Sequence, residues 1–205
     1  MILLTLSTAC NAALVSVNDN TFGANSFTRD TATGLEWLDI NHSDGQSFQS
    51  VSSQLGAGGT FAGLRHATAA ELNQFVLNAA INPAAIAAFN LSAVQTLEAL
   101  VGGPTGIQSF SGGFISVGSR TVTFGMTSDV VTPSSVNYGG VTHTASTLLG
   151  GPGGSGVANA GSQNVATPNH LVGHWLVRNI PEPSSIGLLW VSGLMLGCFR
   201  RRHSS

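Results

Sequence analysis

The sequence contains no lysine and few charged residues of any kind. Charged residues make up 8% of the chain, against about 25% in an ordinary soluble domain. Of the seven cationic residues, all arginine, three lie together at positions 200–202. No basic patch remains that would bind nucleic acid, so we exclude that class of partner. The polar surface must consist mainly of Ser, Thr, Asn, Gln and Gly, which is typical of exported proteins.

Cysteine is nearly absent as well. The two cysteines, Cys10 and Cys198, lie near opposite ends of the chain, and none lies between them. This excludes a disulfide within the intervening domain and a cysteine-ligated metal there. The length of 205 residues, of which 42% are hydrophobic, allows one domain of ordinary size with a tail at each end.

The longest uncharged apolar run lies near the C-terminus. Ile186–Phe199 is preceded by Pro181-Glu182-Pro183, and it is followed by Arg200, Arg201 and Arg202. At about 1.5 Å per residue the run gives roughly 21 Å of helix, and Ser184 and Ser185 can extend it toward the 30 Å or so of a bilayer core. We predict a transmembrane helix over 184–199. The arginines stop transfer and stay in the cytoplasm, because positive charge favours that side.

The N-terminal residues 1–12 have the features of a secretory signal. An apolar stretch, Ile2–Leu6, is followed by small residues, with cleavage expected after Ala12. No Lys or Arg precedes the apolar stretch, so we expect the true start to lie upstream. A signal here and arginines at the other end predict the same topology, with residues 13–179 outside the cell.

The tail resembles the PEP-CTERM sorting signal. Pro181-Glu182-Pro183, the apolar run and the three arginines occur in the order of that signal, and the match covers about residues 181–202. The resemblance implies export by the Sec machinery in a Gram-negative bacterium that makes extracellular polysaccharide. It also implies recognition of Pro-Glu-Pro by an exosortase, which would process an inner-membrane-anchored intermediate. The same tail type is known as the ice-binding protein C-terminal domain, a name that does not imply ice binding by this chain.

The domain between the tails is predicted to be α+β. Strands are expected over 14–22 and on both sides of a turn at Thr33-Gly34. Two central helices are expected, one capped by Thr68 with Glu71 and one from Asn82 to as far as Leu100. Further predictions are two short strands around Gly118-Ser119, a glycine-rich loop over 148–164 and one closing strand over 170–179.

The domain also resembles exported bacterial domains of the DUF1566, or Lcl C-terminal, type. The resemblance rests on three segments: "TGLEWLD" at 33–39, "FAGLRHATAAEL" at 61–72 and "HWLVRN" at 174–179. Leu64-Arg65 stands where that family has Trp-Arg, and Ala67-Thr68 replaces Leu-Pro-Thr. Some members bind sulfated glycans, which the resemblance implies here only as a possible activity.

Three residues of these segments form a candidate ligand site. Glu36 beside Trp37 suits a sugar site, and it equally suits a strand with Trp inward and Glu outward. Arg65 is a candidate glycan or sulfate contact. The alternative is that Arg65 and Arg178 pair with acids such as Glu71 or Asp39. Trp37 and Trp175 are expected in the core.

Metal-binding patterns are weak. Asp39, Asn41 and Asp44 form an oxygen-rich segment that suits calcium, but Asp44 is one residue late for an EF-hand, so an Asx turn is the alternative. His170 and His174 are spaced for zinc on a helix, with His143 as a remote third ligand. The segment is predicted as a strand, on whose exposed side both histidines would lie.

Catalytic and ice-binding patterns are also weak. Thr121-x-Thr123 is a single pair of the kind that an ice-binding face repeats many times. No Gly-x-Ser-x-Gly element occurs, and we predict neither enzymatic activity nor a cofactor. The sequence therefore indicates an exported, non-enzymatic cell-surface or extracellular-matrix protein. The alternatives are a carbohydrate-binding, adhesin-like module that contacts extracellular polysaccharide and, third, an exported hydrolase.

Overall fold

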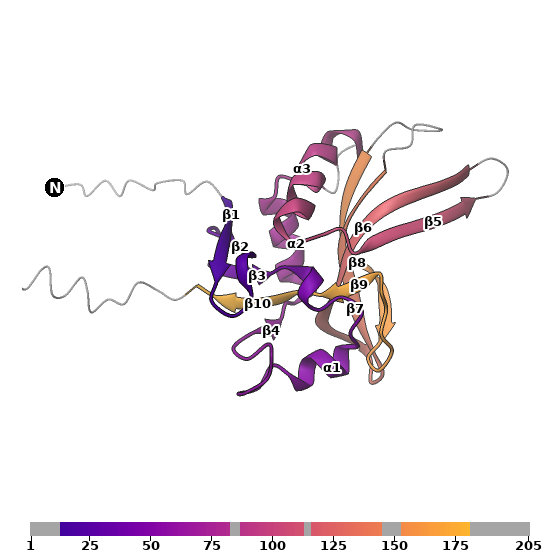
Figure 1. The fold of residues 1–205 in the computed structure, drawn as a ribbon. Coiled ribbons are helices and arrows are strands. Elements are labelled where there is room, and N and C mark those ends of the chain that lie inside the picture. Colours follow the sequence, from indigo (N-terminus) through magenta and orange to yellow (C-terminus); the bar gives the residue numbers. More distant parts are fainter. Residues whose placement is uncertain (1–12, 83–86, 113–115, 145–152, 181–205) are drawn as a thin grey trace, which may run out of the picture.

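The structure is a computed structural model that describes residues 13–82, 87–112, 116–144 and 153–180. Its strands fall into two five-stranded sheets (Figure 1). Sheet A has the order β1-β2-β3-β10-β4, and sheet B has the order β5-β6-β7-β8, with β9 beside β6. Neighbouring strands are antiparallel except β6 and β9, which are parallel. The β-rich α+β class predicted from the sequence is confirmed.

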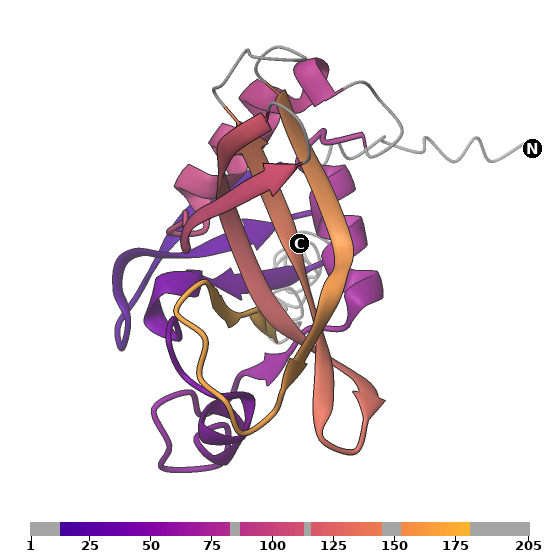
Figure 2. The same cartoon turned by 90° about the vertical axis from the view of Figure 1, so that its right-hand side faces the viewer.

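Sheet A is built from short strands and sheet B from longer ones. The strands of sheet A are β1 (Leu14–Asp19), β2 (Gly23–Asp30), β3 (Leu35–Leu38), β10 (Leu176–Asn179) and β4 (Arg65–His66). Those of sheet B are β5 (Gly106–Gly112), β6 (Ser116–Thr132), β7 (Ser135–Thr144), β8 (Gly153–Asn164) and β9 (Val172–His174). Figure 2 shows the long strands of sheet B running across the direction of those of sheet A.

The helices are α1 (Phe48–Ser53), α2 (Ala69–Asn78) and α3 (Ala87–Leu100), with a 3-10 turn, η1 (Ile40–His42). The predicted capping box of α2 is present, since Thr68 accepts from the Glu71 amide and Glu71 accepts from the Thr68 amide. Both central helices are confirmed within the described residues. The short helix α1 was not predicted, because its polar sequence FQSVSS carries no helical repeat of apolar residues.

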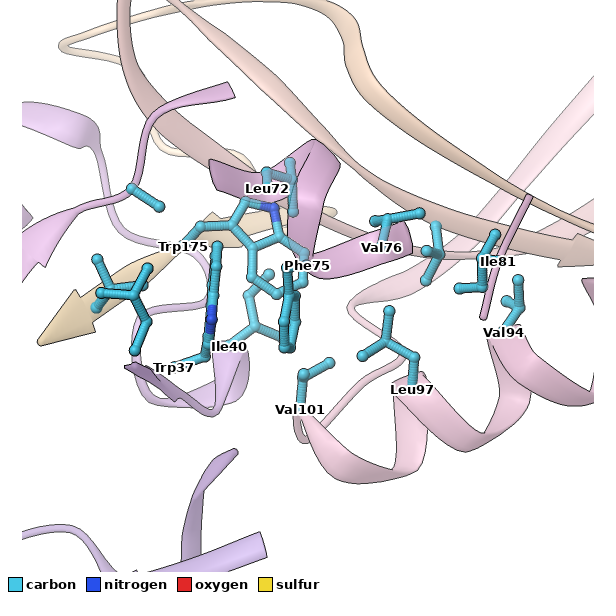
Figure 3. Close-up of a cluster of buried hydrophobic side chains, with 14 residues drawn as sticks. Trp37, Ile40, Leu72, Phe75, Val76, Ile81, Val94, Leu97, Val101 and Trp175 are labelled. Carbon is cyan, nitrogen blue, oxygen red and sulfur yellow. The ribbon is translucent and has the colours of Figure 1, made fainter. Parts of the chain in front are cut away.

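The main core lies where α2, α3 and the two sheets meet (Figure 3). Trp37 stacks on Phe75 with 4.2 Å between ring centroids, and Trp175 meets Trp37 edge-on at 6.0 Å. Both indoles are fully buried, as predicted. Trp175 separates β9 of sheet B from β10 of sheet A, and its Nε1 donates to the Gly139 carbonyl at 2.8 Å. One tryptophan therefore joins the two sheets.

Three expectations about strands were wrong. The sequence predicted two short strands on either side of Gly118-Ser119, but a single strand, β6, runs through both residues, and Gly118 pairs with Phe110 of β5. Residues 153–164 of the predicted glycine-rich loop form β8, and α3 lies against that strand. Glycine there permits a close approach of another backbone, which loop propensity does not reveal. The predicted closing strand over 170–179 is two strands in different sheets.

The predicted membrane segment cannot be compared with the structure. Among residues 13–82, 87–112, 116–144 and 153–180, no helix is long and apolar enough to cross a bilayer. The signal (1–12), Pro181-Glu182-Pro183, the helix 184–199 and the arginines 200–202 all lie outside the described residues.

Candidate functional site

The two faces of sheet A separate the residues that the sequence suggested as a ligand site. Glu36 pairs in register with Arg29 and Arg178, and Trp37 pairs with Thr28 and Val177. Because successive side chains of a strand point to opposite faces, Glu36 and Trp37 lie on opposite sides of the sheet.

Glu36 lies at the centre of a cluster of ion pairs, which we call the Glu36 cluster (Glu36, Arg29, Arg178 and Asp19). Arg29 donates to Oε1 of Glu36 from Nε at 2.9 Å and from Nη2 at 2.6 Å. Arg178 donates from Nε to Oε2 at 2.8 Å and from Nη1 to Asp19 at 2.8 Å. The Arg178 guanidinium also lies 4.0 Å above the centre of the Phe27 ring.

The charges of this cluster are balanced within it. Glu36 is 2% exposed. Burial alone would raise its pKa, but the hydrogen bonds and charges of Arg29 and Arg178 outweigh burial and hold the pKa below its usual value. Burial would also raise the pKa of Asp19, but Arg178 together with the Thr21 and Phe22 amides outweighs burial and lowers the pKa. The cluster joins β1, β2, β3 and β10 and holds Glu36 as an ion-pair partner.

Trp37 and Arg65 make their contacts with other residues and not with Glu36. Trp37 is fully buried and stacked on Phe75, so no face of its ring is open to a sugar. Arg65 pairs with Glu71 through two contacts, of 2.9 and 2.6 Å, which confirms the pairing expected from the sequence. Hydrogen bonding from Arg65 lowers the pKa of Glu71 to about 2. Arg65 pairs in register with Val177, so it lies on the face of sheet A opposite Glu36. The structure does not bring Glu36, Trp37 and Arg65 together.

The candidate calcium segment follows β3. Asp39 precedes η1 and is half-buried, whereas Asn41 and Asp44 are exposed. Burial raises the pKa of Asp39 to about 6, and its Oδ1 is a buried atom for which the described residues provide no hydrogen-bond partner. Burial likewise raises the pKa of Asp44, against the opposing effects of the Gly45 amide and of His170. Within the described residues no group of three or more His, Cys, Asp and Glu side chains is placed to hold a metal ion.

The three histidines considered for zinc have different neighbours. His143 Nδ1 lies 2.7 Å from Oε2 of Glu98, so the two groups form a close, mostly buried contact. His170 is exposed and lies near Gly45. His174 was expected on an exposed strand face, which is wrong: it is 1% exposed and contacts His66.

Sequence reasoning missed two buried polar contacts. His66 and His174 are separated by 108 positions, and Glu98 on α3 meets His143 and Thr123 of sheet B. Neither contact has a local sequence signal, because each depends on how distant strands pair.

Searches of protein-family models, of curated proteins and of solved structures find no match to the chain.

Proposed function

We propose that this chain is an exported, non-enzymatic cell-surface or extracellular-matrix protein that an exosortase sorts through its C-terminal tail. The observation that carries the proposal is the order of Pro181-Glu182-Pro183, the apolar run 186–199 and the arginines 200–202. Proline is tolerated only in the first turn of a helix and disfavours the helical conformation in the residue before it, so we do not expect a helix over 184–199 to include Pro181-Glu182-Pro183. We therefore expect the motif to be accessible to a membrane enzyme at the edge of the bilayer.

The fold is compatible with removal of the tail. The last strand that the structure describes, β10, lies inside sheet A between β3 and β4. Its end is fixed by the Arg178 ion pairs and by the Ile180 amide, which donates to the Gly34 carbonyl at 2.9 Å. All the strands of both sheets are thus complete by Asn179. Cleavage near the Pro-Glu-Pro motif would leave the domain whole.

The two ends of the domain also leave from one end of sheet A. Leu14 pairs with Asp30, Asp30 with Leu35, and Leu35 with Asn179, so these residues form one row across four strands. At about 4.8 Å between neighbouring strands, Leu14 and Asn179 are roughly 14 Å apart. A domain held at both ends during export would present the opposite end of sheet A outward.

The role of Glu36, Trp37 and Arg65 supports a structural protein over a carbohydrate-binding module. Glu36 and Arg65 are each held in ion pairs, and Trp37 is core. The three arginines whose side chains the structure describes, Arg29, Arg65 and Arg178, all pair with acids. None of them is left with an unbalanced charge for a sulfated sugar.

Replacement of both prolines of the motif tests the proposal. We expect the variant Pro181→Ala/Pro183→Ala to remain full-length in the membrane fraction of the producing bacterium. The matched control Pro133→Ala, in the exposed turn between β6 and β7, should be processed like the unaltered protein. Equal processing of all three proteins would contradict exosortase sorting through Pro-Glu-Pro.

A further inference from the structure

Two imidazoles are buried against each other between the sheets. His66 of β4 is 6% exposed and His174 of β9 is 1% exposed. Their atoms Nε2 of His66 and Nδ1 of His174 are 3.1 Å apart, and Nε2 of His174 lies 3.1 Å from the Gln46 carbonyl oxygen. This chain of contacts connects β4 and β9 to the segment before α1.

The contacts fix the protons of the neutral pair. A carbonyl oxygen only accepts, so Nε2 of His174 carries a proton and donates it to Gln46. Nδ1 of His174 is then the acceptor, and Nε2 of His66 donates to it. If one ring is protonated, the neutral ring can still accept from it, but protonation of both rings places two N–H groups against each other and the hydrogen bond between the rings is lost.

Among the residues that the structure describes, no acid is placed to stabilise a charged form of the pair. Burial and the neighbouring His174 lower the pKa of His66 to about 3. Burial lowers the pKa of His174 to about 4, against the opposing Gln46 carbonyl. The ionisable groups of the surrounding elements are engaged elsewhere or exposed: Arg65 with Glu71, Asp129 with the Ala69 amide, His42 against Phe22, and Asp44 and His170 at the surface.

The pair also positions α1. Phe48, the first residue of α1, stacks on His66 with 4.2 Å between ring centroids. Phe48, Val136 and Val165 line a groove of about 330 Å³. Val130, at its rim, is 71% exposed. The groove lining contains no charged residue. Movement of α1 would therefore change an apolar surface.

We propose that the His66–His174 pair is an acid-sensitive latch, which holds Gln46 and Phe48, at the start of α1, in place while neutral and releases them when protonated. Release breaks the contact to Gln46, removes Phe48 from His66 and opens the apolar groove. The latch is distinct from the sorting function proposed above, and it would make exposure of this surface depend on the pH outside the cell.

The sign of the pH dependence follows from the lowered pKa values. In the released segment each imidazole returns to its ordinary pKa of about 6.5. The latched state therefore has its full stability relative to the released state above pH 6.5. This stability decreases as pH falls toward the folded pKa values of about 4 for His174 and about 3 for His66. Each imidazole increases the released fraction by about tenfold per pH unit in that interval.

Amide NMR spectra of the full 205-residue chain in a zwitterionic detergent, recorded from pH 7 to pH 3, test the latch. We expect the resonances of 46–53 to leave their native positions below pH 6.5, while those of β2 and β3 remain native. The steepness should correspond to uptake of about two protons. His66→Gln keeps a donor toward His174 but cannot titrate, so its transition should correspond to about one proton.

The matched control is His170→Gln, because His170 is exposed and outside the pair; it should titrate like the unaltered chain. If His66→Gln does not fold, His174→Gln provides the same comparison, since glutamine can still donate to the Gln46 carbonyl. Native resonances of 46–53 retained to pH 3 would overturn the latch. So would simultaneous loss of β2 and β3, or unchanged steepness in the glutamine variant.

Discussion

Replacement of Glu36 by glutamine separates a structural role from ligand binding. Glu36 is 2% exposed, and its carboxylate accepts three hydrogen bonds from two arginines. Glu36→Gln preserves the size of the side chain but removes the charge. Arg29 and Arg178 are then left beside a neutral amide, and Arg178 retains only Asp19 as an acidic partner.

The expected loss of stability is about 2–3 kcal/mol. Removing one partner of a buried ion pair costs about 3–5 kcal/mol. Here the arginines keep 40% and 31% of their side chains exposed, so water offsets part of that cost. For a domain of this size, such a change lowers the melting temperature by about 5–10 °C.

Urea denaturation at pH 7, followed by circular dichroism, measures this difference. The matched control is Glu71→Gln, because Glu71 also pairs with an arginine but is 28% exposed and its partner 47%. We expect Glu71→Gln to cost about 1 kcal/mol or less. Equal effects of the two substitutions would refute the reasoning. Unchanged stability of Glu36→Gln with lost binding to extracellular polysaccharide would indicate a ligand contact instead.

Two further predictions concern the junction of the sheets and the candidate calcium segment. Trp175→Phe leaves the Gly139 carbonyl without its 2.8 Å hydrogen bond and leaves a cavity. Urea denaturation should therefore show that the free energy of unfolding falls by about 2–4 kcal/mol. A fall of less than about 1 kcal/mol would contradict the conclusion that Trp175 joins the two sheets. Because burial raises the pKa of Asp39 to about 6, the carboxylate destabilises the fold increasingly as pH rises from 3.8 to 6. Asp39→Asn should therefore stabilise the protein by about 1–2 kcal/mol at pH 7 and have no effect below about pH 4. Destabilisation at pH 7 would mean that the carboxylate has a cationic partner such as calcium.

Local signals in the sequence predicted local structure well. Thr68 and Glu71 predicted the start of α2, because the capping box is made by residues three positions apart. The turn at Thr33-Gly34 is present, and Gly34 has a φ of 72°, a conformation that favours glycine. The pairing of Arg65 with Glu71 likewise bridges only six positions.

Contacts between distant segments could not be predicted in the same way. Arg178 was expected to pair with an acid such as Glu71 or Asp39, but it pairs with Asp19 and Glu36, 159 and 142 positions away. His66 and His174 meet because β4 pairs with β10, where His66 is in register with Leu176, two residues after His174. Such pairs depend on strand order and register, which hydrophobic periodicity does not specify.

The glycine content of residues 153–164 led to the wrong prediction of a loop where sheet B has a strand. The sequence over 153–164 contains glycine at several positions and few large side chains, so it was predicted as a loop. In the structure Gly154 and Gly156 pair with His143 and Val141 of β7. His143 contacts Glu98 of α3, and Val141 belongs to the main core. At such positions glycine allows the helix to lie close to the strand.

The most direct test of the proposed function is the intact mass of the protein from the producing bacterium, measured separately in the membrane and extracellular fractions. The account predicts an extracellular form that begins near Ala13 and ends near Pro181-Glu182-Pro183, so that both tails are gone and all the strands remain. Recovery of only full-length, membrane-bound protein, with Arg200, Arg201 and Arg202 still present, would contradict sorting and identify the tail as a permanent anchor.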